Sequence, residues 1–382
     1  MALKTSRRGE VPPFIVMDVM QAAARREAEG HHVLHLEVGQ PDTPAPAGVR
    51  AAAQAAIGTE RLGYTVAPGI PALQQAIAGH HARMYGHEIE PDRVFVTTGS
   101  SSAFTLAFLA AFDAGDRVAL ANPGYPAYRN ILTALGIEVL DLPVDGSTNF
   151  QPSPAMLDAL DVRVDGLIVA SPSNPTGTML TPDELGALVG YCNENRIRLI
   201  SDEIYHGITY GTVAETAAKL DDDAIVINSF SKYFSMTGWR LGWMIVPPAL
   251  RRSVECLAQN LFISPPVVSQ HAALAAFDCY DELDGYVARY ADNRRVLLAG
   301  LPAVGIERLA SADGAFYVYA DVSDLTDDSV GFCRRMLDEA GVAATPGVDF
   351  DPGRGRRFVR FSFAGSTTDM KTAVEKIGDW LS

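Results

Sequence analysis

The chain has 382 residues, of which 48% are hydrophobic and 20% charged, and its formal net charge at pH 7 is −15. This length and composition predict a soluble globular enzyme with two domains, or one large domain and a smaller one, around a substantial core. The negative charge disfavours nucleic acids and anionic membranes as partners, and no apolar run approaches the roughly 18 residues that a membrane helix needs.

The N-terminus, the cysteines and the histidines predict a cytoplasmic protein without a metal site. The first eight residues carry positive charge, but no apolar signal core follows them. The cysteines are widely spaced and form no Cys-x-x-Cys pair, which argues against zinc and disulfides. The histidines gather at residues 31–35 and 80–87 without carboxylate or cysteine partners at ligand spacing, so we expect both clusters to be solvated surface.

The predicted elements indicate an α/β fold. The first dozen residues resemble a loose arm, which the two prolines at 12 and 13 end. From about residue 94, helix-like stretches such as 101–112 and 182–195 alternate with β-rich runs. The predicted strands are residues 94–97, 117–121, 138–142, 167–170, 199–201, 224–228 and 241–246. Near-continuous apolar strands separated by helices predict a mainly parallel sheet that is covered on both faces.

The C-terminal third has a different pattern. A helical pattern runs from about residue 249 to 277, and a more polar unit with strands near 316–320 and 358–363 follows it. We therefore predict an N-terminal arm and joining segment (1–40), a large domain (41–280) and a small α+β domain (281–382).

Ligands of parallel sheets bind in the loops that follow the carboxyl ends of the strands. Lys232 lies in such a loop, after the strand 224–228, among small and hydroxyl residues. Partial desolvation there lowers the pKa of a lysine and makes its amine a nucleophile. Taken alone, its position favours a strand-end lysine whose amine stays in water.

A glycine turn after the strand 94–97 predicts an anion site. Gly99 permits the turn, and Ser100 and Ser101 place N–H groups and hydroxyls at the start of a helix, where the dipole favours phosphate. The same residues would suit an ordinary helix cap. Together with Ser229 and Arg240 they form a candidate phosphate cup, because a guanidinium can hold two oxygens.

Three further polar residues follow or interrupt apolar strands. Two prolines and a glycine in the loop 171–177 direct Asn174 into the cleft. Asp202 and Arg360 lie at positions where an unpaired charge is costly, so Asp202 calls for a cation and Arg360 for an anion such as a substrate carboxylate.

These motifs resemble one known family. Ser-x-Ser-Lys (229–232) followed by Thr-Gly-Trp-Arg-Leu-Gly (237–242) is similar to the Schiff-base segment of the class I/II pyridoxal-phosphate (PLP) aminotransferases of fold type I. The other motifs occur in the family's order between about residues 36 and 364. The resemblance implies a large PLP-binding domain, with a mainly parallel seven-stranded sheet between helices, and a smaller α+β domain.

The resemblance also implies roles for residues around the cofactor. Lys232 holds PLP and moves a proton, Asp202 pairs with the pyridine nitrogen, and Asn174 and Tyr205 contact the phenolic oxygen. Lys232, Asp202 and Tyr205 are thus the catalytic candidates. Ser100, Ser101, Ser229 and Arg240 bind the phosphate.

For the remaining positions, the family pattern places Tyr125 against the cofactor ring. Tyr64 reaches the phosphate of a neighbouring subunit, which implies a homodimer with shared active sites. Gly39, Asn174 and Arg360 bind the substrate, and Gly39 lets its carboxylate approach the backbone.

The predicted function is a ping-pong transfer of an amino group between an L-amino acid and a 2-oxo acid. A PLP-dependent carbon–sulfur β-lyase would use the same residues and is the first alternative. A PLP-binding regulatory module is a remote one. Ser100 and Ser101 stand where some relatives that prefer dicarboxylates have a basic residue, which argues against aspartate as the best donor.

Overall fold

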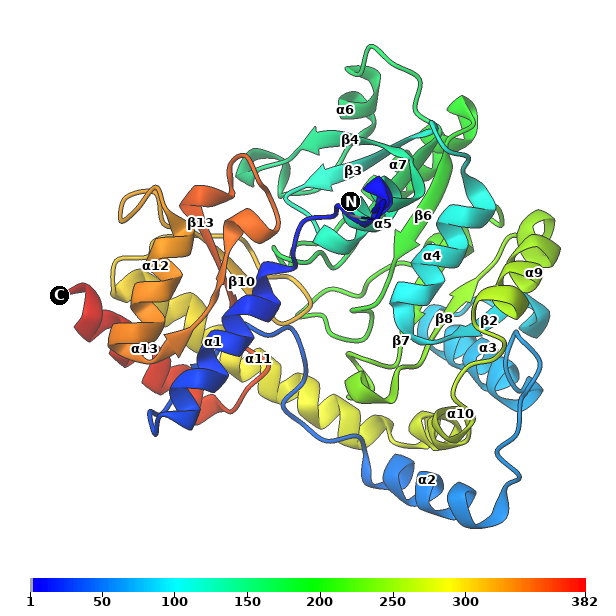
Figure 1. The fold of residues 1–382 in the computed structure, drawn as a ribbon, viewed down its shortest axis with the longest axis horizontal. Coiled ribbons are helices and arrows are strands. Elements are labelled where there is room, and N and C mark those ends of the chain that lie inside the picture. The colour runs from blue at the N-terminus through cyan, green and yellow to red at the C-terminus, as the bar shows by residue number, and fades with distance from the viewer. Residues whose placement is uncertain (1–2) are drawn as a thin grey trace.

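The computed structural model describes residues 3–382, and a seven-stranded sheet forms its centre (Figure 1). The strand order is β2-β8-β7-β6-β5-β3-β4, and β8 runs antiparallel to both of its neighbours. The strands are β2 (Val94–Thr97), β3 (Arg117–Asn122), β4 (Glu138–Pro143), β5 (Gly166–Ala170), β6 (Arg198–Asp202), β7 (Ile225–Ser229) and β8 (Gly242–Ile245). The predicted mainly parallel sheet of seven strands is confirmed.

Helices cover both faces of this sheet because its central strands are apolar on both. Every residue of β7 is buried. Ile225 and Ile227 pack into a core with α4, α5 and α9, whereas Val226 between them joins the core that α3 and α7 share on the other face. Alternate residues of a strand point to opposite faces, so this continuous apolar run specifies a sheet between two helical layers.

The helices follow the predicted pattern with one correction. They are α1 (Ile15–Ala28), α2 (Ala47–Thr59), α3 (Pro71–Tyr85), α4 (Gly99–Ala111), α5 (Pro126–Leu135), α6 (Pro154–Asp158), α7 (Pro182–Asn195), α8 (Ala217–Leu220), α9 (Arg251–Leu261), α10 (Val267–Leu274), α11 (Tyr280–Ala303), α12 (Ser329–Arg335) and α13 (Thr367–Leu381). The single helix predicted over 249–277 is wrong. It divides into α9 and α10 because Pro265 and Pro266 cannot continue a helix. Within residues 3–382, no helix combines the length and apolarity that a membrane span requires.

A second, smaller sheet holds the C-terminal part of the chain. Its order is β12-β13-β10-β9, and all its pairs are antiparallel. The strands are β9 (Arg308–Leu309), β10 (Tyr317–Asp321), β12 (Thr345–Pro346) and β13 (Phe358–Ser362). β10 and β13 correspond to the two strands predicted near 316–320 and 358–363.

The N-terminal segment packs on this smaller unit. β1 (Leu34–His35) pairs in parallel with β11 (Val342–Ala343). The buried carboxylate of Asp349 accepts hydrogen bonds from the first two N–H groups of α1, at Ile15 (2.8 Å) and Val16 (3.3 Å). These contacts are compatible with a joining segment over 1–40, although the three domain boundaries stay a prediction.

The prediction of solvated histidines is wrong for His80 and His81. Both lie on α3 with Leu73 and Ile77, and burial lowers their pKa values to about 3 and about 4. His35 does have carboxylate partners, Glu37 at 2.9 Å and Glu27 at 3.1 Å. The hydrogen bond to Glu37 is the largest cause that raises the pKa of His35 to about 9.

Removal of the Asp349 carboxylate should destabilise α1 locally. In Asp349→Ala, two helix N–H groups lose their acceptor, which costs about 1–2 kcal/mol for a helix cap. We expect amide hydrogen exchange across α1 to accelerate by about tenfold. Asp338→Ala is the control, because it removes only an exposed pair with Arg26 worth about 0–1 kcal/mol. Equal exchange in α1 of both variants would contradict this role.

Candidate functional site

One cleft collects most of the predicted site residues. It lies where loops at the carboxyl ends of the central strands meet the smaller sheet and α1. The predicted residues that line it are Gly39, Ser100, Ser101, Tyr125, Asn174, Asp202, Tyr205, Lys232, Arg240 and Arg360. Because loops at the carboxyl ends of parallel strands lie at one edge of the sheet, residues that are far apart in sequence meet in this cleft.

Lys232 projects into the cleft from the loop after β7. Its Nζ donates a hydrogen bond to the carbonyl of Gly39 and lies 5.8 Å from the centre of the Tyr205 ring. Burial and then the positive charge of Arg360 lower the pKa of Lys232 to about 7, while Asp202 opposes the shift. At neutral pH a large fraction of this amine is therefore unprotonated and able to act as a nucleophile or base.

Asp202 ends β6 and is buried without an ion pair among the described residues. One carboxylate oxygen accepts a hydrogen bond from the Tyr128 hydroxyl and the other from the Ile204 N–H at 3.1 Å. Burial raises the pKa of Asp202 to about 6, although these two donors favour the carboxylate. A cationic ligand group beside Asp202 would remove the cost of its burial.

The N-terminus of α4 and Arg240 form an anion-binding corner. The cap residue Thr98 makes no side-chain bond to the helix, so the N–H groups of its first turn keep their capacity to donate to a ligand. A Cβ on Gly99 would lie 2.5 Å from a guanidinium nitrogen of Arg240, and one on Gly242 would lie 2.9 Å from the Ser100 nitrogen. Both glycines are thus needed for the guanidinium and the helix end to converge.

The two serines before Lys232 differ in position. Ser231 lines the cleft, whereas Ser229 is buried behind it, with 2.8 Å between their hydroxyl oxygens. The Ser229 oxygen also lies 3.1 Å from the carbonyl of Leu241. The structure therefore places Ser231, which the sequence interpretation did not select, on the wall of the cleft, and the predicted role of Ser229 at the phosphate stays a prediction.

Arg360 is a buried cation without a carboxylate partner in the described part of the chain. It lies on β13, is 3% exposed, and stacks on the rings of Tyr317 and Phe350 at 4.4 and 4.8 Å from their centres. One terminal nitrogen donates to Asn174 Oδ1 at 2.8 Å and the other to the carbonyl of Glu37. Its Nε has no hydrogen-bond partner. This arrangement is suited to an anionic ligand.

Tyr205 and Tyr317 join the two sheets across the cleft. Their hydroxyl oxygens lie 2.6 Å apart, and burial raises the pKa of Tyr205 well above its usual value. A Cβ on Gly39 would lie 2.1 Å from the Tyr317 hydroxyl. Only glycine can therefore hold this backbone against Tyr317 and the Lys232 amine.

The two remaining predicted tyrosines lie in different environments. Tyr125 lines the cleft, and its ring meets those of Phe14 and Tyr128 edge-on at 5.8 and 5.3 Å between centres. Tyr64 is 85% exposed and lies outside the cleft. Because its side chain is largely exposed among the described residues, its predicted contact with the phosphate of a second subunit stays a prediction.

Several cleft residues escaped the sequence interpretation. Tyr128 follows Tyr125 by three residues on one face of a helix, a spacing that could have identified it. The apolar wall formed by Phe14, Val16, Met17 and Met20 comes from the start of α1. Tyr317 gave no local signal, because its importance depends on a partner 112 positions away.

Known proteins resemble this chain over nearly its whole length. Residues 31–377 match the family described as aminotransferase class I and II. The valine–pyruvate aminotransferase of Mycobacterium tuberculosis is 54% identical over 99% of this chain and 98% of that protein. The crystal structure of an aminotransferase from the same organism has a TM-score of 0.98 and 53% identity, covering 100% of this chain and 99% of that one. Aspartate aminotransferase from Thermus thermophilus with maleate has a TM-score of 0.93 and 30% identity, covering 99% and 100%.

The lowered pKa of Lys232 predicts a pH-dependent labelling pattern. An acylating reagent reacts only with an unprotonated amine. In the cofactor-free protein, the extent of labelling of the peptide that contains Lys232 should therefore rise with pH, with its midpoint near pH 7. Free Nα-acetyl-lysine, the internal standard, should reach its labelling midpoint at a pH of about 10.4. Arg360→Gln removes a repelling cation and should raise the Lys232 midpoint, whereas Arg356→Gln, on the exposed surface, should leave it unchanged. Mass spectrometry measures both, and coincident midpoints for Lys232 and the standard would contradict the description.

Proposed function

The chain belongs to the class I and II aminotransferases, and from this premise we propose that it transfers amino groups with PLP bound at Lys232. The enzyme moves an amino group between an amino acid and a 2-oxo acid. The observation that carries the proposal is the buried, unpaired guanidinium of Arg360 beside an amine of lowered pKa. A substrate α-carboxylate supplies the anion that this guanidinium lacks.

The residues in the cleft fit PLP in both charge and position. The N-terminus of α4 with Ser100 and Ser101, the hydroxyl pair of Ser229 and Ser231, and Arg240 would hold the phosphate, because they combine backbone donors, hydroxyls and a guanidinium. Asp202, buried without a cation, would hold the protonated ring nitrogen. Tyr125 would lie against the ring, and Asn174 and Tyr205 would donate to its phenolic oxygen. When bound, PLP supplies an electron sink for the charge that develops at the substrate Cα.

The chain's own groups then bind the substrate and move its proton. Arg360, steadied by Asn174, holds the α-carboxylate and orients the Cα–H bond toward Lys232. Once the substrate amine has displaced it, the Lys232 amine would take the Cα proton as a base and deliver it to C4′ of the cofactor as an acid, since a pKa of about 7 suits both roles at neutral pH. Hydrolysis would release the donor as a 2-oxo acid while its amino group stays on the cofactor, and a second oxo acid would accept that group to complete the ping-pong cycle.

We propose an apolar amino acid as the donor. The cations that line the cleft are Lys232, Arg240 and Arg360, and each has a role toward the cofactor or the α-carboxylate. On the α1 side the wall consists of Phe14, Val16, Met17 and Met20. Aspartate would leave its second carboxylate unpaired against this wall. The 54% identical relative is named for valine and pyruvate, which supports an aliphatic donor and pyruvate as acceptor.

A homodimer with shared active sites completes the proposal. Tyr64 lies on an exposed segment with other apolar side chains, Ile57 and Val66, which are 64% and 60% exposed. Such residues suit burial against a second copy, which would bring Tyr64 to the partner's phosphate site. A cytoplasmic location stays a prediction, supported by four cysteines that form no disulfide. The relatives described above are aminotransferases, which favours transfer over carbon–sulfur elimination or a regulatory role.

A half-reaction tests this function directly. Mixed with L-valine and no oxo acid, the PLP-loaded enzyme should release one 2-oxo acid per active site and no ammonia. L-Aspartate should react with a kcat/KM at least about tenfold lower, since one mismatched side-chain contact is worth about 1–3 kcal/mol. Chromatography of the oxo acids and an ammonia assay provide the measurement. Continuous release of pyruvate and ammonia from cystathionine, without any oxo acid, would instead establish the β-lyase.

A further inference from the structure

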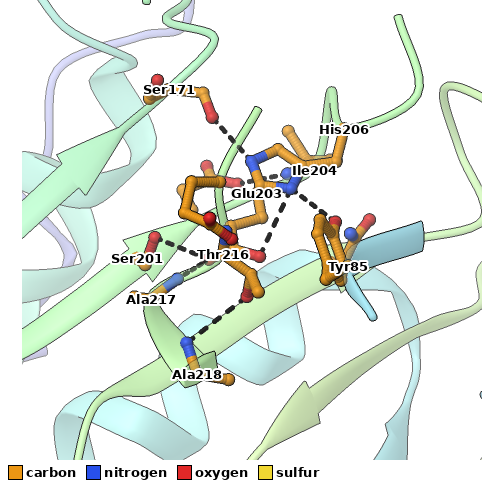
Figure 2. A network of polar contacts seen from close by, with 12 residues as sticks. Tyr85, Ser171, Ser201, Glu203, Ile204, His206, Thr216, Ala217 and Ala218 are labelled. Carbon is orange, nitrogen blue, oxygen red and sulfur yellow. Dashed lines mark hydrogen bonds and ion pairs between the residues drawn. The ribbon is translucent and has the colours of Figure 1, made fainter. Parts of the chain in front are cut away.

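A buried polar network lies behind the end of β6, outside the cleft (Figure 2). It joins Tyr85 at the end of α3, Glu203 and His206 in the turn after Asp202, and the carbonyl of Ser171. The proposed mechanism uses none of these residues. We propose that His206 is a positioning residue whose Nε2–H holds the Ser171–Gly177 loop, and with it Asn174, in place in the active site.

The contact between His206 and Ser171 ties this loop to the turn after β6. Ser171 is the first residue after β5, and its carbonyl oxygen lies 2.9 Å from His206 Nε2. A carbonyl can only accept, so Nε2 must carry the proton. Asp202, just before this turn, and Tyr205 within it line the cleft, whereas His206 is not among the residues that line it. One short segment thus supplies two active-site residues and also anchors the neighbouring loop.

Tyr85 selects this tautomer. Its hydroxyl lies 2.5 Å from His206 Nδ1, and Glu203 Oε2 is farther away at 3.4 Å. Because burial lowers the pKa of His206 to about 4, the ring is neutral, and Nδ1 then accepts the Tyr85 O–H. The other Glu203 oxygen accepts from Ser201 Oγ at 3.0 Å and from the Ala217 N–H at 2.9 Å, which holds Glu203 itself in place.

The anchored loop carries Asn174 to Arg360. Inside the loop, Gly177 N donates to the Ser173 carbonyl at 2.8 Å and Ser173 N to the Thr178 carbonyl at 3.0 Å, so hydrogen bonds connect the residues on both sides of Asn174. Asn174 Oδ1 accepts from Arg360 at 2.8 Å. A shift at Ser171 is therefore transmitted to the side chain that the proposed function places at the cofactor's phenolic oxygen. The inference rests on that proposed function for its effect on the cofactor, but not for its effect on the loop.

A matched pair of substitutions tests the role of Nε2. The amide nitrogen of His206→Gln can reach the position of Nε2 and donate to Ser171, whereas that of His206→Asn reaches only the position of Nδ1. Both variants remove the ring and keep a polar amide. In the cofactor-free protein, we expect the rate of amide hydrogen exchange in residues 171–178 to rise by about tenfold in His206→Asn and to change little in His206→Gln. A tenfold rise corresponds to the loss of one buried hydrogen bond. Exchange in α7, measured in the same digest, corrects for global destabilisation.

A second readout follows the cofactor. In the PLP-loaded enzyme, the pH midpoint of the visible absorbance reports the hydrogen bonds to the phenolic oxygen. It should shift by about half a unit or more in His206→Asn and stay near the wild-type value in His206→Gln. Tyr85→Phe keeps the ring and removes one hydroxyl. It should change the exchange rate of residues 171–178 and the absorbance midpoint in the same direction as His206→Asn does. If His206→Asn does not fold, Tyr85→Phe provides the test in its place.

The outcomes separate the two proposals. Equal exchange and equal midpoints in His206→Gln and His206→Asn, or a Tyr85→Phe enzyme that matches the wild type, would overturn the positioning role. A wild-type protein that binds no PLP would overturn the proposed function, and the exchange measurements would still decide whether His206 anchors the loop.

Discussion

A guanidinium kept from water needs an anion, and Arg360 is 3% exposed and forms no ion pair with a carboxylate among the described residues. Moving an ion out of water costs several kcal/mol even after relaxation. Here the cost is offset by carbonyl and amide oxygens and by stacking on Tyr317 and Phe350. After burial, the same charge is the next largest cause that lowers the pKa of Lys232 to about 7. Binding of a carboxylate would neutralise Arg360 and raise the proton affinity of Lys232 at the stage when it must accept a proton.

This coupling requires the two sheets to hold their positions relative to one another. Arg360 comes from β13 of the smaller sheet, and Lys232 follows β7 of the larger one. The Tyr205–Tyr317 contact and the Gly39 backbone lie between them. Glycine is needed at position 39 because a side chain would displace the Tyr317 hydroxyl. The chemistry of the cleft thus depends on backbone packing as much as on charged side chains.

The sequence predicted the features that depend on local pattern. Apolar strands followed by polar loops located Lys232, Asp202 and Asn174, since parallel strands end at one edge. Two errors had signals that were present: Pro265 and Pro266 interrupt the helix predicted over 249–277, and His80 follows Leu73 and Ile77 at helical spacing. Tyr317 and the α1 wall could not be predicted in this way, because their roles depend on segments that meet only in the folded chain.

The central claim is that this cleft binds PLP through Lys232, and borohydride reduction tests it most directly. The reduced holoenzyme, digested and analysed by mass spectrometry, should have a phosphopyridoxyl group on the peptide that contains Lys232. A Lys232→Ala protein treated in parallel should have none on that peptide. An unmodified Lys232 in the reduced wild-type enzyme, or a label on a different lysine, would contradict the account.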